Sequence, residues 1–192
     1  MSKGRIEAFS DAVIAIAITI MVLELKVPDG ADWRALTADT SALLAYVLSF
    51  VFLGIYWNNH HHMLQVTQRI DGAILWANLH LLFWLSLIPF ATHWLAQQYT
   101  AAAPTVFYGA ILLCSGISYT ILQTTIIRSE GAASRLAQAV QNDVKGRLSL
   151  MLYVAALGLA FVRPWISDAI FVTVAVMWIV PDRRIERLTA ER

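Results

Sequence analysis

The segment RIEAFSDAVIAIAITIMVLELKVP, residues 5–28, decides the fold. From about Ala8 to Leu25 nearly every side chain is apolar, and a helix that crosses a bilayer needs about 20 such residues, with about 17 as a lower limit. The segment holds Thr19 and then Glu24-Leu25-Lys26, with no small-x-small cleavage site after it. We therefore expect a retained membrane span and not a cleaved signal peptide.

The composition of the whole chain agrees with a membrane protein. Of the 192 residues, 58% are hydrophobic and 14% are charged, and the mean hydropathy is +0.61. Ordinary soluble domains carry about 25% charged residues. A soluble chain of this length leaves a large share of its surface in water and could not hide so much apolar surface. The low charge and the many aromatic residues also exclude a disordered chain.

Six apolar stretches are long enough, or nearly long enough, to span a bilayer. They run from about Ala8 to Leu25, Ser41 to Trp57, Ala73 to Leu95, Pro104 to Ile127, Leu148 to Val162 and Pro164 to Val180. We predict an all-α polytopic membrane protein, with residues 1–192 forming a single domain of six transmembrane helices. The polar loop from Arg128 to Arg147 is expected to hold a short helix.

The basic residues predict the orientation. An even number of spans puts both termini on one side, and that side collects eleven of the fourteen Lys and Arg residues. Only Lys26, Arg34 and Arg163 fall on the other side. Because cytoplasmic loops carry the excess of Lys and Arg, both termini are expected in the cytoplasm.

Several classes of function lack support in the sequence. The net charge is +1 without a basic block, so no nucleic-acid partner is expected. The single cysteine, Cys114, allows neither an intramolecular disulfide nor a thiolate zinc cluster. The run His60-His61-His62 invites a metal site, but consecutive helical residues point about 100° apart and do not converge on one ion. Neither Gly-x-Ser-x-Gly nor His-Glu-x-x-His occurs. We therefore predict that the chain binds no metal and no cofactor and is not an enzyme.

The first span has one distinctive face. At about 100° per residue, an arc of about 120° collects a stripe of seven side chains. The stripe consists of Phe9, Ala12, Val13, Ile16, Thr19, Ile20 and Leu23. An apolar stripe with one hydroxyl is commonly a packing face, but it also suits a pore wall with hydrophobic constrictions. Spacing alone does not separate these two interpretations.

Arg5 and Asp11 place ionisable groups near one end of this span, where such groups usually find partners inside the protein. They are six positions apart and face different directions, so each should contact the second or third span and not the other. The candidate partners are Asn59, His60, His61 and Asn78. The alternative is an interfacial anchor in which Ser10 or Asp11 caps the start of the helix.

The pattern Arg5-x-x-x-Phe9-Ser10-Asp11, followed by an apolar helix that ends in Leu23-Glu24-Leu25-Lys26-Val27-Pro28, resembles the bacterial transmembrane protein 175 potassium-channel family. Further matching segments are Tyr56-Trp57-x-Asn59-His60-His61, Asn78 and Ser86-Leu87-Ile88-Pro89-Phe90. The resemblance covers about the first 95 residues, and the later spans match only in number and length.

The resemblance implies a homotetramer in the bacterial plasma membrane, with the first helices around a central pore and potassium as the permeant ion. Like the family, the chain has no Thr-Val-Gly-Tyr-Gly selectivity loop. Carried over by position, the narrowest apolar ring falls on Ile16 and further rings fall on Ile20 and Leu23. Thr19 corresponds to a hydroxyl layer linked to cation selectivity.

The resemblance also implies how the pore helix is held. Phe9, Ser10 and Asp11 hold its cytoplasmic end against the neighbouring helices. His60 and His61 are expected to pair with the Arg5 and Asp11 end, while His62 departs into the loop.

Other polar residues leave narrower expectations. Glu24 lies at the outer end of the first span, where a ring of carboxylates would concentrate cations; alternatively it pairs with Lys26 or Arg34. In the third span, His80 is expected to join Asn78 as a buried interhelical hydrogen bonder. His93 is expected in the interfacial aromatic belt beside Trp94, and Pro89 is expected to kink the helix.

The sequence thus predicts a passive potassium-selective cation channel with hydrophobic constrictions. A proton leak through the same pore is the nearest alternative. Two alternatives belong to other functional classes. One is a small membrane enzyme that uses the cluster of His60, His61 and Asp11, and the other is an assembly protein that conducts no ions.

Overall fold

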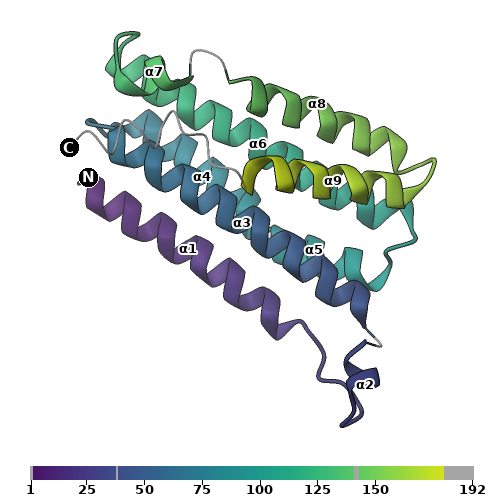
Figure 1. The fold of residues 1–192 in the computed structure, drawn as a ribbon. Helices are drawn as coiled ribbons and strands as arrows, with labels where there is room; N and C mark the ends of the chain where they lie inside the picture. The colour runs from purple at the N-terminus through teal and green to yellow at the C-terminus, as the bar shows by residue number, and fades with distance from the viewer. Residues whose placement is uncertain (1, 38, 141–142, 180–192) are drawn as a thin grey trace.

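The computed structural model describes residues 2–37, 39–140 and 143–179, and every regular element within these ranges is a helix. The helices are α1 (Lys3–Leu23), α2 (Trp33–Thr37), α3 (Thr40–Val66), α4 (Gly72–Ser86), α5 (Ile88–Gln97), α6 (Ala102–Glu130), α7 (Arg135–Val140), α8 (Val144–Leu159) and α9 (Pro164–Ile179). The long helices run side by side, and α2 lies at the end of the bundle opposite to the start of α1 (Figure 1). The predicted all-α class is confirmed.

Four of the six predicted spans are long, apolar helices. They are α1, α3, the α4–α5 pair and α6, and each has the length and hydropathy of a membrane span. The last two predicted spans form α8 and α9 with 16 residues each, short of the usual length of about 20. Membrane crossing by these two helices stays a prediction, and the predicted end at Val180 lies outside the described residues.

Of the two predictions about loops, one is confirmed and one is wrong. The short helix expected between Arg128 and Arg147 is present as α7. The second span was expected to end near Trp57, with His62 in a loop, and this is wrong because α3 continues to Val66. The segment after Trp57 contains neither proline nor glycine, and its Met63 and Leu64 side chains are fully buried, so nothing interrupts the helix there.

The third span is interrupted at Leu87, between α4 and α5. Pro89 has no N–H to donate one turn back, and its ring crowds the preceding turn. The Leu87 N–H bonds instead to the Trp84 carbonyl, 3.2 Å away. The predicted disturbance of the helix is therefore present as a break at Leu87, and α5 packs against α1.

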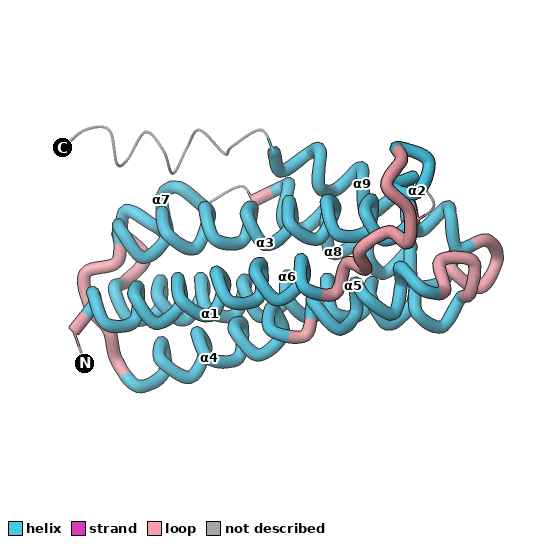
Figure 2. Tube along the Cα trace, turned by 90° about the horizontal axis from the view of Figure 1, so that it is seen from below, coloured by secondary structure: helices cyan, strands magenta, loops and turns pink. Residues whose placement is uncertain are grey.

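Helix α1 packs against α3, α4 and α5, and it lies along one side of the bundle (Figures 1 and 2). Its contact face consists of the buried side chains Ile6, Ser10, Ile14, Ala17 and Met21. These positions recur every three or four residues, as one face of a helix requires. The helices α6, α8 and α9 pack on one another, and among the described residues α1 is covered on one side only.

The turn between α3 and α4 is fixed by Asp71. Its Oδ1 accepts the Ile74 N–H at 2.9 Å and caps α4, and its Oδ2 accepts the Ser129 hydroxyl of α6 at 2.7 Å. These donors favour the charged form, so the pKa of the Asp71 carboxyl is lowered, chiefly by the Ile74 N–H and then by Ser129.

We expect that the midpoint temperature of thermal unfolding falls less steeply on acidification in Asp71→Asn than in the wild type. A carboxyl whose pKa is lower in the folded chain stabilises the fold above its unfolded pKa, and that contribution is lost as the pH falls through the folded pKa. Asparagine still caps the helix but does not titrate. Thermal unfolding between pH 7 and pH 3 measures this, with Asp39→Asn at the N-cap of α3 as the control; parallel curves for wild type and Asp71→Asn would contradict it.

Candidate functional site

The first helix presents an exposed apolar stripe to its surroundings. The exposed fractions are 48% for Phe9, 57% for Ile16, 43% for Ile20 and 80% for Leu23. The buried face of α1 lies elsewhere on the helix, and it is the face that packs on α3, α4 and α5. Apart from Val13, which is half-buried against the core, the stripe is thus not part of the core of this chain, and it remains available to a pore, a second chain or lipid.

Thr19 lies on this stripe, one turn beyond Ile16. It is exposed, and its hydroxyl donates to the Ile16 carbonyl at 3.0 Å. This is the bond that a threonine inside a helix commonly makes. It uses the hydroxyl hydrogen and leaves the oxygen lone pairs free to face whatever lies beside the stripe.

A groove of about 450 Å³ separates the stripe from the α4–α5 break. Its lining consists of Val13, Ile16, Ala17, Ile20, Glu24, Ser86, Pro89, Phe90 and His93. At one end of the groove the Glu24 Oε2 atom lies 3.4 Å from His93 Nδ1. The alternative in which Glu24 pairs with Lys26 or Arg34 is not what the structure shows, because Glu24 contacts His93 instead, and this contact is an ion pair only when that ring is protonated.

A buried polar chain ties α1 to α3 and α4. Asn78 Nδ2 donates to the Ser10 hydroxyl at 3.0 Å, and Asn78 Oδ1 lies 2.7 Å from His60 Nε2. Ser10 itself donates to the Ile6 carbonyl at 2.8 Å. Because a carbonyl oxygen only accepts, His60 carries its hydrogen on Nε2 in this arrangement. All three side chains are at most 1% exposed, so each bond is made away from water.

Asp11 is held by a second contact with α3. Its Oδ1 accepts the indole N–H of Trp57 at 3.0 Å. The His61 ring stacks on Trp57 with the ring centroids 5.9 Å apart, and His61 Nε2 bonds to Gln65. The contact of Asp11 with the second span agrees with expectation, but the partner does not, because Trp57 takes the place of the four expected residues.

The other residues expected in this polar network lie outside it. Asn59 donates to the Ile55 carbonyl of its own helix. Arg5 is exposed, and no described residue gives its guanidinium group a polar partner. Ser10 and Asp11 lie well inside α1, which begins at Lys3, so the alternative in which they cap the helix is wrong.

The adjacent histidines diverge, as three successive helical positions must. His60 points to Asn78 and His61 to Trp57 and Gln65. His62 lies inside α3, and its Nδ1 is buried without a hydrogen-bond partner among the described residues.

The third span contains one wrong expectation. His80 is exposed and accepts the indole N–H of Trp84 from its own helix at 3.0 Å, so it is not an interhelical partner of Asn78. His93 is half-buried, faces Glu24 and bonds to Gln97, which agrees with a position at the end of the span.

Sequence reasoning gave Trp57 no role, although it lies in a matched segment. An indole N–H is a donor only, and Trp57 lies one turn before His61 on the same face of α3. The indole N–H of Trp57 has no acceptor on its own helix, and the neighbouring span carries the carboxylate of Asp11. This pairing of a donor with an acceptor was the sequence signal that could have predicted the contact.

The comparisons with known proteins bear on what this arrangement does. A sequence model of the family described as "Endosomal/lysosomal potassium channel TMEM175" matches residues 5–89. A potassium channel of Chryseobacterium sp. (strain P1-3) is 50% identical over 191 residues, which is 100% of both chains. The chain belongs to the TMEM175 potassium-channel family.

Two further TMEM175 relatives extend the comparison. The crystal structure of a lysosomal potassium-selective channel TMEM175 homolog from Chamaesiphon minutus matches with a TM-score of 0.81 and 29% identity, covering 94% of this chain and 97% of that one. The human endosomal/lysosomal proton channel TMEM175 is 33% identical over 114 residues, which are 53% of this chain and 22% of the human protein.

Membership in the TMEM175 family makes this chain a membrane ion channel. The family consists of channels and not of enzymes, so the rival interpretation as a small membrane enzyme has no support. The matched residues 5–89 include α1 from Arg5 onward, together with the partners of its buried polar chain on α3 and α4.

Proposed function

We propose that the chain is a potassium-selective channel of the bacterial plasma membrane, in which four copies surround a pore lined by α1. The observation that carries this proposal is the exposed apolar stripe of a helix whose other side is hydrogen-bonded and buried. A helix that only faces lipid does not need buried hydrogen bonds to hold its position. A helix that lines a pore must keep its position relative to the neighbouring helices while ions pass.

In this proposal Ile16, Ile20 and Leu23 form successive apolar rings, with Ile16 the narrowest. Each ring is a constriction that passes ions only when it is wet. Glu24, beside His93 at the outer end, concentrates cations at the pore mouth. With six spans, the side of the termini would hold eleven of the fourteen basic residues of the sequence, which supports cytoplasmic termini.

Proton conduction is the second candidate function, and the name of the human relative favours it. Water that crosses an apolar constriction also carries protons. The two candidates share one pore and differ only in the ion that passes.

The experiment that separates them is ion flux from the purified protein in liposomes. A potassium gradient that drives flux at constant internal pH supports the potassium channel, and a pH gradient that dissipates without potassium flux supports the proton channel. An intact tetramer that carries neither ion would contradict the proposed function.

Thr19→Val is expected to lower the preference for potassium over sodium while conduction survives. Four Thr19 oxygens one turn beyond Ile16 offer a weak polar ring to a partly dehydrated cation, and potassium sheds water more readily than sodium. The effect is modest because hydroxyls form a sparser field than stacked carbonyl rings. Reversal potentials measure it, with Thr19→Ser as the control that keeps the hydroxyl; an unchanged value in Thr19→Val would assign Thr19 to packing.

A further inference from the structure

A polar pocket of about 210 Å³ lies at the end of the bundle where α1 begins. It is lined by Val66, Gln68, Arg69, Glu130, Ser134 and Arg135. These residues come from the end of α3, the α3–α4 turn, the end of α6 and the start of α7. Since α3 and α6 are both candidate membrane spans, their ends place the pocket at the level of the lipid headgroups.

The turn that carries Arg69 is fixed in place. Glu130 Oε1 accepts the backbone N–H groups of both Gln68 and Arg69, the latter at 3.3 Å. Asp71 accepts the Ser129 hydroxyl at 2.7 Å and thus joins the same turn to α6 a second time. The pocket is therefore a built feature of the fold and not a chance meeting of surface side chains.

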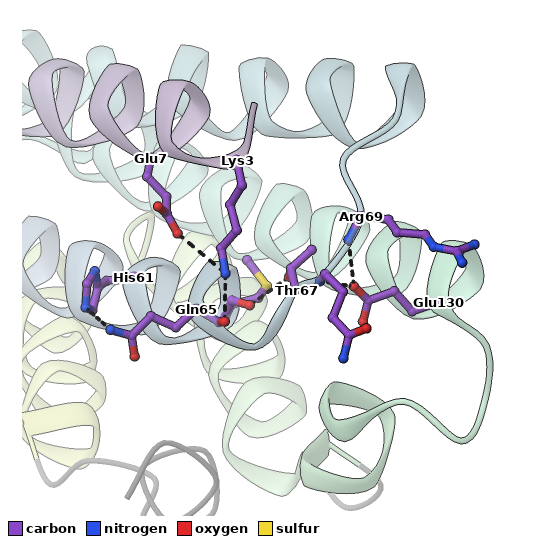
Figure 3. Close-up of polar contacts among 9 residues, drawn as sticks. Lys3, Glu7, His61, Gln65, Thr67, Arg69 and Glu130 are labelled. Atoms are coloured by element: carbon purple, nitrogen blue, oxygen red, sulfur yellow. Dashed lines mark hydrogen bonds and ion pairs between the residues drawn. The ribbon is translucent and has the colours of Figure 1, made fainter. Parts of the chain in front are cut away.

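The charges of the lining point to an anionic ligand. Two guanidinium groups, on Arg69 and Arg135, outnumber the single carboxylate of Glu130, whose Oε1 atom already accepts two backbone N–H groups. Figure 3 shows the Arg69 side chain extending away from Glu130 while its backbone nitrogen faces it. Neither arginine forms an ion pair with a described residue.

We propose that this pocket binds a phosphate group, with Arg69 and Arg135 as the charged ligands and Gln68 and Ser134 as neutral donors. Guanidinium groups match phosphate oxygens in paired hydrogen bonds, and basic pockets between membrane helices suit anionic headgroups. The phosphate belongs either to a phospholipid or to a soluble compound. The inference rests on the proposed function only in placing this end of the bundle at a membrane surface.

The test measures binding by the full chain in phosphatidylcholine nanodiscs, without any ion flux. One arm adds phosphatidic acid to the bilayer and measures its retention against phosphatidylcholine by mass spectrometry. The other arm titrates inorganic phosphate by calorimetry. Arg69→Gln and Arg135→Gln should each weaken binding about fivefold, and the double variant about thirtyfold, from about 1 kcal/mol per basic residue. Arg128→Gln, an exposed arginine outside the lining, is the matched control and should change nothing.

The possible outcomes distinguish a lipid phosphate from a soluble phosphate, and both from a pocket that binds no phosphate. Selective retention of phosphatidic acid identifies a lipid headgroup, and saturable binding of inorganic phosphate identifies a soluble ligand; both support the site when the double variant loses them. Absence of both signals, or equal losses in Arg128→Gln, overturns the proposal. A chain that binds phosphate but carries no potassium would overturn the channel proposal alone.

Discussion

Asparagine in place of Ile16 is expected to raise sodium permeability more than any other single substitution in α1. Ile16 is 57% exposed on the apolar stripe, so the change leaves the core of the chain intact. A polar side chain of similar size at the narrowest ring holds water in the constriction and lowers the barrier for a hydrated ion. We expect sodium flux in liposomes to rise about tenfold, equivalent to a barrier lower by about 1.4 kcal/mol.

The matched control is Val22→Asn. Val22 is 46% exposed on α1 but lies outside the stripe, so the same polar change there should leave sodium flux unaltered. Equal leaks through Ile16→Asn and Val22→Asn would mean that the leak comes from a disturbed bilayer, and the assignment of Ile16 to the pore would fail.

The predictions that held are those that depend on one helix at a time. Length and hydropathy located four long apolar helices, and the 3.6-residue period placed Ile16, Ile20 and Leu23 on one face, which the structure leaves exposed. Pro89 broke its helix because the cause is local to the backbone.

The predictions that failed concern which side chains meet across helices. Asp11 bonds to Trp57, and His80 bonds within its own helix to Trp84. Such partners depend on how each helix is rotated and tilted relative to its neighbours. The periodicity of a single segment does not determine this rotation and tilt. The end of α3 failed for a related reason, since burial of Met63 and Leu64 by other helices sustains a segment whose own composition is polar.

Helix α1 is held to its neighbours at five levels along its length. From one end to the other they are Lys3 with Gln65, Ser10 with Asn78, Asp11 with Trp57, Met21 with Thr92 and Glu24 with His93. Figure 3 shows the first of these contacts, where the Lys3 ammonium reaches the carbonyl at the end of α3. The Ser10 and Met21 levels are both buried, but the thioether of Met21 is a weak acceptor at 3.9 Å and the Thr92 hydroxyl has closer oxygen acceptors in Ser49 and Ile88. The Ser10 level should therefore contribute most to the position of α1.

Asn78→Leu is therefore expected to destabilise the protein more than any other loss of a single contact to α1. Leucine fills a similar volume but leaves the His60 Nε2–H buried without an acceptor and removes the donor to Ser10. A buried polar group without a partner costs about 1–3 kcal/mol. Thermal unfolding in detergent measures the loss, and Asn59→Leu is the control because the Asn59 side chain donates to the Ile55 carbonyl of its own helix, while the backbone carbonyl that accepts the Tyr119 hydroxyl stays in place.

A second substitution tests whether the cost comes from the unpaired histidine. Replacing both partners of a buried hydrogen bond by apolar groups is often nearly neutral, because no polar group is then left unpaired. The double variant Asn78→Leu with His60→Phe should thus recover much of the stability that Asn78→Leu loses, and the two changes should be strongly non-additive. Losses that simply add, or an Asn78→Leu protein as stable as Asn59→Leu, would show that the chain from His60 through Asn78 to Ser10 does not fix the pore helix.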